Sequence, residues 1–265
     1  MNENNRLVRQ YWNDKDTVSL KDSLLKEIEM EQIKEYLTSK EKLFTWGLEL
    51  GCGDGEGSCR YAEHVHEFIA VDYSLTMLQK AQLRIKEKGV NNCFLVCADV
   101  RHLPFSMKPL FDVIISERCL INLANWPEQA DVLRSIPHYI KENGYWIFIE
   151  GTRQGLENLN RQRDILGLKP IPMPWHNCFF DEKELLPLLG LFFNIAERGS
   201  FWFYYLISRA MQPALVFPQD PSYDNPLNQI AAKLYHSMAG EFFSQQKDLP
   251  SLGQIFYLLL EKKAV

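Results

Sequence analysis

Four glycines on alternate positions follow directly after a short apolar run in the first quarter of the chain. The stretch reads Gly-Leu-Glu-Leu-Gly-Cys-Gly-Asp-Gly-Glu-Gly and covers residues 47–57. Glycine at this density is needed where the backbone takes positive φ values or where a ligand approaches without a Cβ in its way. Both demands arise where a nucleotide crosses the end of a parallel strand. The stretch therefore predicts a strand that ends in a cofactor-binding loop of an α/β fold.

The spacing of these glycines argues against two kinds of nucleotide site. A dinucleotide fingerprint needs G-x-G-x-x-G, and its third glycine would fall at Glu56 in one register and at Ser58 in the other. No Lys-Ser/Thr pair follows the glycines, which excludes a phosphate-binding P-loop. What remains is E-x-G-x-G-x-G, which resembles the first motif of class I S-adenosylmethionine-dependent methyltransferases. The resemblance implies that the cofactor is bound by Glu49, Gly51, Cys52, Gly53 and Gly55.

The charges around the loop favour the same cofactor. Dinucleotides and ATP carry phosphates, which bind at helix N-termini and beside cations, whereas S-adenosylmethionine carries a sulfonium and no phosphate. The loop and the strand ends near it carry the acidic residues Glu49, Asp54, Glu56, Asp72 and Asp99. An acidic pocket of this kind suits a cationic sulfur.

A second strand, over Glu67–Asp72, ends in an acid about 20 residues beyond the glycines. Ser74 then caps a helix whose apolar residues fall at helical spacing. The segment Val-Asp-Tyr-Ser-Leu-Thr-Met-Leu resembles the second motif of the family. That resemblance implies that Asp72 binds the ribose hydroxyls, with Tyr73 beside it, and that Met77 lies near the adenine.

Three further strands follow in the order that the fold requires. The run Cys93–Ala98 leads into Ala-Asp-Val-Arg-His-Leu-Pro-Phe, which is similar to the family's A-D-x-x-x-L-P-F segment. The similarity implies that Asp99 accepts from the adenine amino group and that the backbone of Val100 reads the ring. A fourth strand, Phe111–Ser116, would bring Ser116 and Glu117 to the cofactor, and a fifth covers Tyr145–Glu150. The resemblance spans about residues 44–150.

The family fold completes its sheet with an antiparallel pair, for which Asn194–Leu206 and Gln254–Glu261 are the candidates. We therefore predict an α/β, doubly wound, mostly parallel seven-stranded sheet with an antiparallel final strand. Residues 1–43 would form an N-terminal helical cap, with a helix over Leu20–Leu37 and with Tyr11 close to the methionine end of the cofactor. Residues 44–265 would form the methyltransferase domain.

Two helical insertions, at about 151–190 and 207–250, follow the fifth and sixth strands. Ligands bind at the carboxyl ends of strands in such sheets, so both insertions are expected to be substrate lids. In the second one, Asn225 and Pro226 begin a helix whose apolar stripe contains Leu227, Ile230, Ala231, Leu234, Tyr235 and Met238.

Composition narrows the partners and the compartment. The formal net charge of −5 disfavours a nucleic acid partner, which would need a basic surface. The six cysteines form no C-x-x-C pair and are expected to be reduced thiols, and His64 and His66 are not spaced as metal ligands. The N-terminus has no apolar signal segment, and the most apolar stretch, residues 185–196, is too short to span a bilayer. A cytoplasmic protein is expected, while its oligomeric state stays open.

The chemistry asked of the site is modest, since methyl transfer needs alignment and exclusion of water. A general base is required only if the acceptor loses a proton. Glu117 and His176 are weak candidates for that role, beside His102 and Glu150, and the sequence assigns it to none of them.

The acceptor would be a small molecule or a glycan. Residues 201–228 resemble methyltransferases found among polysaccharide biosynthesis proteins, and the aromatic run 201–205 could stack on sugar faces. Whether O, N or C is methylated stays open. The alternatives are a non-catalytic S-adenosylmethionine-binding protein and a nicotinamide-dependent oxidoreductase.

Overall fold

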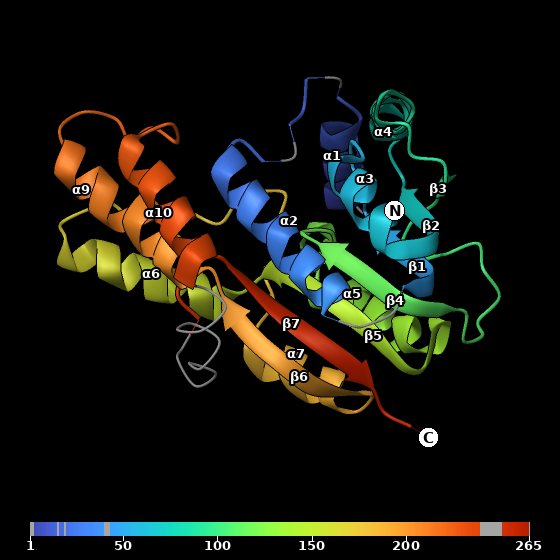
Figure 1. Ribbon diagram of the computed structural model, residues 1–265. Helices are drawn as coiled ribbons and strands as arrows, with labels where there is room; N and C mark the ends of the chain where they lie inside the picture. Colours follow the sequence, from blue (N-terminus) through green and yellow to red (C-terminus); the bar gives the residue numbers. More distant parts are fainter. Residues whose placement is uncertain (1–2, 15, 19, 40–42, 239–250, 265) are drawn as a thin grey trace.

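A seven-stranded sheet forms the centre of the molecule (Figure 1), in the order β3-β2-β1-β4-β5-β7-β6. The structure is a computed structural model that describes residues 3–264 except 15, 19, 40–42 and 239–250. The strands are β1 (Phe44–Leu50), β2 (Val65–Asp72), β3 (Cys93–Cys97), β4 (Phe111–Glu117), β5 (Ile140–Gly151), β6 (Phe193–Ser200) and β7 (Ile255–Lys262). Strands β1 to β5 pair in parallel, while β7 runs antiparallel to both β5 and β6. The predicted fold class is confirmed.

Helices cover both faces of this sheet. The α-helices are α1 (Glu3–Asn13), α2 (Ser23–Thr38), α3 (Glu56–Tyr61), α4 (Leu75–Lys88), α5 (Trp126–Ser135), α6 (Arg153–Ile165), α7 (Glu182–Gly190), α8 (Trp202–Tyr205), α9 (Gln212–Val216) and α10 (Pro226–Met238). Short 3-10 turns are η1 (Ala62–His64), η2 (Leu120–Asn122) and η3 (Ile136–Tyr139), and η4 (Leu206–Met211) is a π-helix.

Alternation along the strands divides the core between the two faces. On β4, Val113 and Ile115 pack in one core with buried side chains of α2, α3, α8 and α10. Ile114, between them, faces the other core, which contains buried side chains of α5 and α7. Both faces of the central strands are therefore buried, as a parallel sheet requires.

Side-chain caps fix where several helices begin. Ser74 accepts from the backbone N–H of Met77 and starts α4, as the sequence predicts. Asn225 accepts from Leu227 ahead of Pro226, and Asp181 accepts from Lys183 at the start of α7. The cap of α2 is Asp22, so this helix begins three residues later than the predicted Leu20.

The predicted sixth strand, Asn194–Leu206, is wrong in its second half. Strand β6 ends at Ser200, which pairs with Phe256, and its neighbour β7 begins only one residue earlier, at Ile255. Beyond this point the chain has no partner strand and turns into α8. Three of the five aromatic rings then point inward at helical spacing, and Phe201, Tyr204 and Tyr205 are buried. They form core and not a sugar-stacking strand.

Strand β5 is longer than the predicted Tyr145–Glu150, because it begins at Ile140. Gly144, just before the predicted start, therefore lies inside the strand. Helix α5 stops at Ser135 and passes through a 3-10 turn into the strand.

The helix expected in the second insertion exists, but its buried face differs from the predicted stripe. Ala231, Ala232 and Tyr235 are buried in the core shared with α2, whereas Ile230 and Leu234 are exposed. Figure 1 shows α9 and α10 beside each other, with α6 below them, at the end of the molecule away from β3. Residues 239–250 of the insertion lie outside the described residues. The packing of α10 on α2 makes it part of the core.

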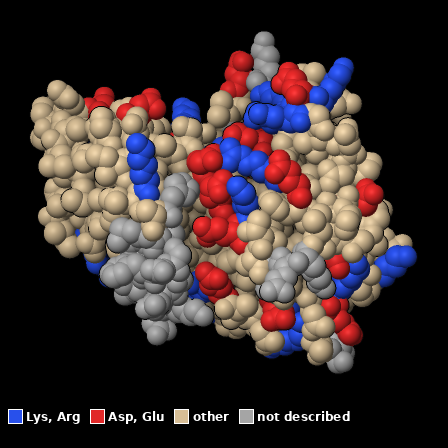
Figure 2. All heavy atoms as spheres, in the orientation of Figure 1, with Lys and Arg blue, Asp and Glu red and all other residues tan. Residues whose placement is uncertain are grey.

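Charged side chains gather in the middle of one face (Figure 2). Helix α2 forms ion pairs with α3 and with the loop before it: Lys26 lies 2.6 Å from Glu56 and 3.8 Å from Asp54, and Arg60 lies 2.7 Å from Glu27. These pairs fasten the N-terminal helices to the side of the glycine loop.

Candidate functional site

A cavity opens at the carboxyl ends of the central strands. β1 lies between β2 and β4 and connects to β2, so the chain reverses its direction across the sheet at this point, where open α/β sheets bind ligands. The cavity is lined by Asn5, Val8, Arg9, Trp12, Leu20, Lys26, Glu49, Gly51, Cys52, Gly53, Asp54, Gly57, Asp72, Tyr73, Met77, Asp99, Val100, Arg101, Glu117, Arg118, Cys119, Asn122 and Leu123. Ten of the residues predicted to contact the cofactor are among them.

The three glycines of the motif, Gly51, Gly53 and Gly55, all have positive φ, but they have different structural roles. A Cβ on Gly51 would lie 2.6 Å from Sγ of Cys119, and one on Gly55 would lie 2.8 Å from Cβ of Ala81. These two glycines therefore allow close packing of the loop. A Cβ on Gly53, at φ 53°, would meet nothing within 4 Å. Gly53 is thus the residue whose missing side chain leaves space in the cavity for a ligand.

Asp72 fastens the glycine loop to the next helix. Its Oδ2 accepts from the backbone N–H of Gly53 at 2.9 Å, and its Oδ1 accepts from that of Ser74 at 2.8 Å. Burial raises the pKa of Asp72, against these backbone donors, which lower it. Each carboxylate oxygen keeps a second lone pair, so the same group fits a ribose hydroxyl at the cavity wall.

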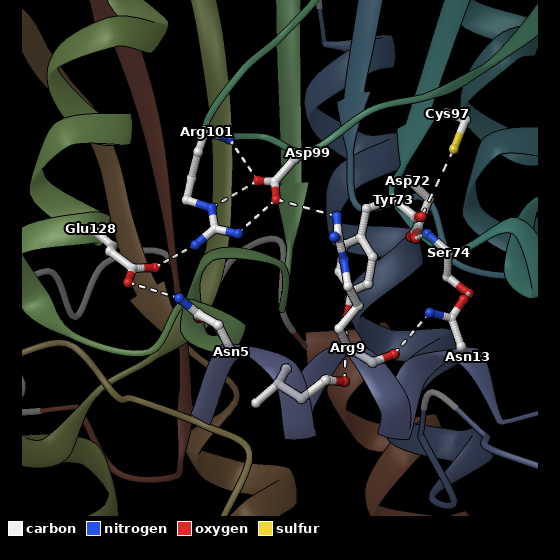
Figure 3. Close-up of polar contacts among 11 residues, drawn as sticks. Asn5, Arg9, Asn13, Asp72, Tyr73, Ser74, Cys97, Asp99, Arg101 and Glu128 are labelled. Atoms are coloured by element: carbon white, nitrogen blue, oxygen red, sulfur yellow. Dashed lines mark hydrogen bonds and ion pairs between the residues drawn. The ribbon is translucent and has the colours of Figure 1, made fainter. Parts of the chain in front are cut away.

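Asp99 lies in a network of charges shown in Figure 3. Arg101 donates to it twice, from Nε at 2.9 Å and from Nη2 at 2.7 Å, and its third nitrogen donates to Glu128 at 2.7 Å. Arg9 of α1 lies 3.7 Å from the same carboxylate. Burial opposes ionisation of Asp99, but these cations outweigh it and lower its pKa. Asp99 is therefore a permanent acceptor, and Arg101 shares it with any ligand amino group.

Helix α1 brings Asn5 and Arg9 to this network (Figure 3), and both residues also line the cavity. The hydroxyl of Ser74 donates to the carbonyl of Trp12 at 2.9 Å, and the indole N–H of Trp12 donates to Asn122 at 3.1 Å. Asn5 donates to Glu128 at 2.9 Å. These bonds join α1 to α4, η2 and α5, so the N-terminal segment closes the cavity from outside.

Two further carboxyl groups line the cavity, the buried Glu49 and the half-buried Glu117. Glu49 accepts from the hydroxyl of Ser58 at 2.5 Å, and burial raises its pKa to about 8. Glu117 accepts from the hydroxyl of Tyr61 at 2.9 Å, and burial followed by the charge of Glu29 raises its pKa to about 7. Both groups change charge close to neutral pH, and both would be stabilised in the ionised form by a cationic ligand.

Four predicted site residues lie elsewhere. Gly55 is the N-cap of α3 beside Ala81, and Ser116 accepts from the indole of Trp146 in the core. The ring of Tyr11 stacks on His176 with 4.6 Å between centroids, outside the cavity lining. The alternation of β4 explains Ser116, since its neighbour Glu117 takes the cavity side.

The other base candidates have different surroundings. Glu150 accepts from the backbone N–H groups of Cys119, Leu120 and Ile121, so it holds the η2 turn in place. His102 is exposed. Sequence reasoning missed the cationic lining residues Arg9, Lys26, Arg101 and Arg118, because nothing in a linear motif shows that they turn inward.

Within the described residues, no group of three or more His, Cys, Asp or Glu side chains could hold a metal ion. No helix in that part of the chain is both long enough and apolar enough to cross a membrane.

Comparisons with known proteins bear on the fold and on its cofactor. Residues 48–144 match a methyltransferase domain family. An N-methyltransferase, NodS from Bradyrhizobium japonicum, solved with S-adenosylhomocysteine, superposes with a TM-score of 0.58 at 14% identity, covering 99% of this chain and all of that one. The chain has the methyltransferase fold. Magnesium protoporphyrin IX methyltransferase from Synechocystis, solved with S-adenosylmethionine bound, gives a TM-score of 0.56 at 17% identity over 75% of this chain and 90% of that one.

Among curated proteins, the demethylmenaquinone methyltransferase of Lactococcus lactis is 27% identical over 158 residues, which are 58% of this chain and 55% of that enzyme. The chain thus spans about half the length of the first curated relatives that it matches. Together, the domain match and the cofactor-bound structures support S-adenosylmethionine as the cofactor of this methyltransferase fold.

Proposed function

We propose that the protein transfers a methyl group from S-adenosylmethionine to a small-molecule acceptor and releases S-adenosylhomocysteine. The observation that carries the proposal is the cavity wall at Gly53. A Cβ added there would meet nothing within 4 Å, and the cavity that Gly53 lines also contains acids at the ends of β1, β2 and β4. When bound, the cofactor supplies an electrophilic methyl group on a cationic sulfur.

The residues of the chain would then hold, orient and shield the reactants. Asp99 and Asp72 accept from the adenosine part, while Gly53 leaves backbone space and Glu49 and Glu117 favour positive charge. Helix α1 excludes water, because Trp12 is bonded at both its carbonyl and its indole to the walls of the cavity. Alignment and water exclusion are the main requirements of an in-line methyl transfer.

Glu117 is the better of the two candidate bases if the acceptor must lose a proton. It lines the cavity, and its pKa of about 7 suits proton transfer at neutral pH. His176, by contrast, stacks on Tyr11 outside the lining. Its burial lowers its pKa, and its Nδ1 has no hydrogen bond among the described residues.

The first insertion, 151–190, is proposed as a lid. Its loop meets α1 through aromatic contacts, with Tyr11 5.6 Å from Trp175 and 4.6 Å from His176 between ring centroids. The second insertion, 207–250, is proposed to support the cavity from the side instead of covering it, since α10 packs on α2. A glycan acceptor loses its main support, because the rings at 201, 204 and 205 are buried. The net charge of −5 favours an acceptor other than nucleic acid.

Turnover with labelled cofactor tests this proposal. Purified protein is incubated with methyl-labelled S-adenosylmethionine and fractionated small-molecule extract, and label in extract products is measured, with Gly53→Ala as control. Label that appears with the native protein and not with the variant supports methyl transfer. Tight binding of the cofactor without any labelled product from small-molecule, glycan or nucleic acid fractions would favour a non-catalytic binding protein instead.

A further inference from the structure

Arg118, which lines the cavity, has an unusual backbone conformation. It follows directly after β4, and its φ of 52° is one of two positive values among the described residues other than glycine. Its N–H donates to the carbonyl of Ile149 at 2.8 Å, and its own carbonyl accepts from the side chain of Asn122 at 2.7 Å. Non-glycine residues keep such a conformation only where the surroundings enforce it, and functional sites are the common place.

The side chain of Arg118 is held along one edge. Its Nε and Nη2 donate to the two carboxylate oxygens of Glu29 at 2.7 and 2.5 Å, and the hydroxyl of Tyr205 lies 3.5 Å from Nη2. Glu29 is fully buried in α2, so this pair cannot swing away. The remaining nitrogen, Nη1, has no hydrogen bond within the described part of the chain. The side chain is 20% exposed and lines the cavity.

The other cationic side chains of the lining either have carboxylate partners close by or are not held in one direction. Arg101 uses all three guanidinium nitrogens on Asp99 and Glu128. Lys26 lies between two carboxylates, 2.6 Å from Glu56 and 3.8 Å from Asp54. Arg9 lies beside Asp99 at the mouth, with 42% of its side chain exposed. Arg118 is thus the lining cation, among the described residues, that combines a fixed direction with open donors.

We propose that Arg118 binds a carboxylate inside the cavity, through the guanidinium edge that Glu29 leaves open. The proposal rests on the proposed function, because the carboxylate is either that of the cofactor's methionine part or one on the acceptor. Nη1 still offers two N–H donors in the fixed guanidinium plane, and a hydrogen bond between charged groups of this kind is stronger than one between neutral groups. A carboxylate fits better than a phosphate, because Glu29 already offsets the charge of Arg118 and Glu117 lies next to it, so a doubly charged group would be repelled.

The pair must be removed as a unit, since Arg118→Gln alone would leave Glu29 buried without its partner. The test variant is therefore Glu29→Gln/Arg118→Gln. Its matched control is Glu27→Gln/Arg60→Gln, which removes another two-bond ion pair of α2, with both distances at 2.7 Å, at a place outside the cavity lining. Thermal unfolding of both variants shows that each is folded before binding is measured.

Two binding series separate the sources of the carboxylate. The first series is calorimetry with S-adenosylhomocysteine and with 5′-methylthioadenosine, which lacks the amino acid part. If Arg118 binds the carboxylate of the cofactor, the test variant should bind S-adenosylhomocysteine at least about tenfold more weakly than the native protein does, and 5′-methylthioadenosine equally well. In NMR titrations with acetate and benzoate, with and without S-adenosylhomocysteine, an acceptor role predicts binding to the native protein and to the control that the test variant loses.

Either pattern supports the proposal. Unchanged affinity for S-adenosylhomocysteine, together with no carboxylate binding that depends on Arg118, would overturn it and leave the ion pair as a link between α2 and β4. If the native protein does not bind S-adenosylhomocysteine, the proposed function is wrong. The NMR titrations without S-adenosylhomocysteine would then still decide whether Arg118 binds carboxylates.

Discussion

Replacing Gly53 by alanine isolates the space that the glycine loop leaves for the cofactor. The structure offers a matched control in Gly89, which also has positive φ, at 68°, and also has nothing within 4 Å of an added Cβ. Gly89 is the C-cap of α4 and lies outside the cavity lining. The two substitutions therefore impose the same backbone cost, and only one of them places a methyl group in the cavity.

The backbone cost is about 1–2 kcal/mol at either position, because an L-residue is forced into the left-handed region. For a chain of this size each variant should lose about 2–8 °C of melting temperature. Gly53→Ala should in addition lose about 1–3 kcal/mol of binding free energy, the usual cost of an added carbon where a well-packed contact has no room. This corresponds to about fivefold to 150-fold in affinity.

Calorimetry with S-adenosylhomocysteine and differential scanning calorimetry measure the two effects. We expect equal melting temperatures for the variants, native affinity in Gly89→Ala and weakened affinity in Gly53→Ala. If Gly53→Ala binds the ligand as tightly as Gly89→Ala does, the cofactor does not lie against this loop, and the reasoning from the glycine motif fails.

Three further predictions concern the acids of the site. Asp99→Ala should weaken the binding of S-adenosylhomocysteine by about 1.5–3 kcal/mol, the scale of a hydrogen bond to a charged group. The melting temperature should change little, because Arg101 keeps its bond to Glu128. Unchanged binding in calorimetry would mean that Asp99 serves only as a partner of Arg101. Asp72→Ala should lower both the affinity for S-adenosylhomocysteine and the melting temperature, because the N–H groups of Gly53 and Ser74 lose their acceptor. If neither quantity falls, Asp72 does not hold the glycine loop against α4. The pKa values of Glu117 and Glu49 are raised to about 7 and about 8, so both groups ionise as the pH rises through this range. Between pH 6 and 9, the affinity for the cationic S-adenosylmethionine should therefore increase several-fold relative to the affinity for S-adenosylhomocysteine. Glu117→Gln should flatten that ratio, and a native ratio independent of pH would contradict the placement of these acids near the sulfur. The same shifts stabilise the fold at pH values below about 4.5, and this contribution should be lost as the pH rises to about 8.

The strand ends could be predicted from the sequence because each carries a residue type that its position demands. Gly53, Asp72 and Asp99 follow apolar runs at the spacing of an α/β sheet, and all three line the cavity. Local signals of this kind depend on neighbours in the chain, which is why the caps at Ser74 and Asn225 were also predicted correctly.

Features that depend on residues far away in the chain could not be predicted from the sequence in this way. The run 201–205 has strand-like composition, but β7 begins at Ile255 and offers nothing to pair with beyond Ser200. Likewise, Arg118 turns into the cavity because of Glu29, which lies 89 residues away in the chain. Neither partner is visible in a motif, so the cationic part of the site emerged only from the structure.

Equilibrium binding of S-adenosylmethionine, S-adenosylhomocysteine and NAD, measured side by side by calorimetry on the native protein, tests the central claim most directly. The account predicts one site per chain for both sulfur ligands, competition between them, and no binding of NAD, since Glu56 occupies the third glycine position of a dinucleotide loop. Binding of NAD without binding of either sulfur ligand would contradict it.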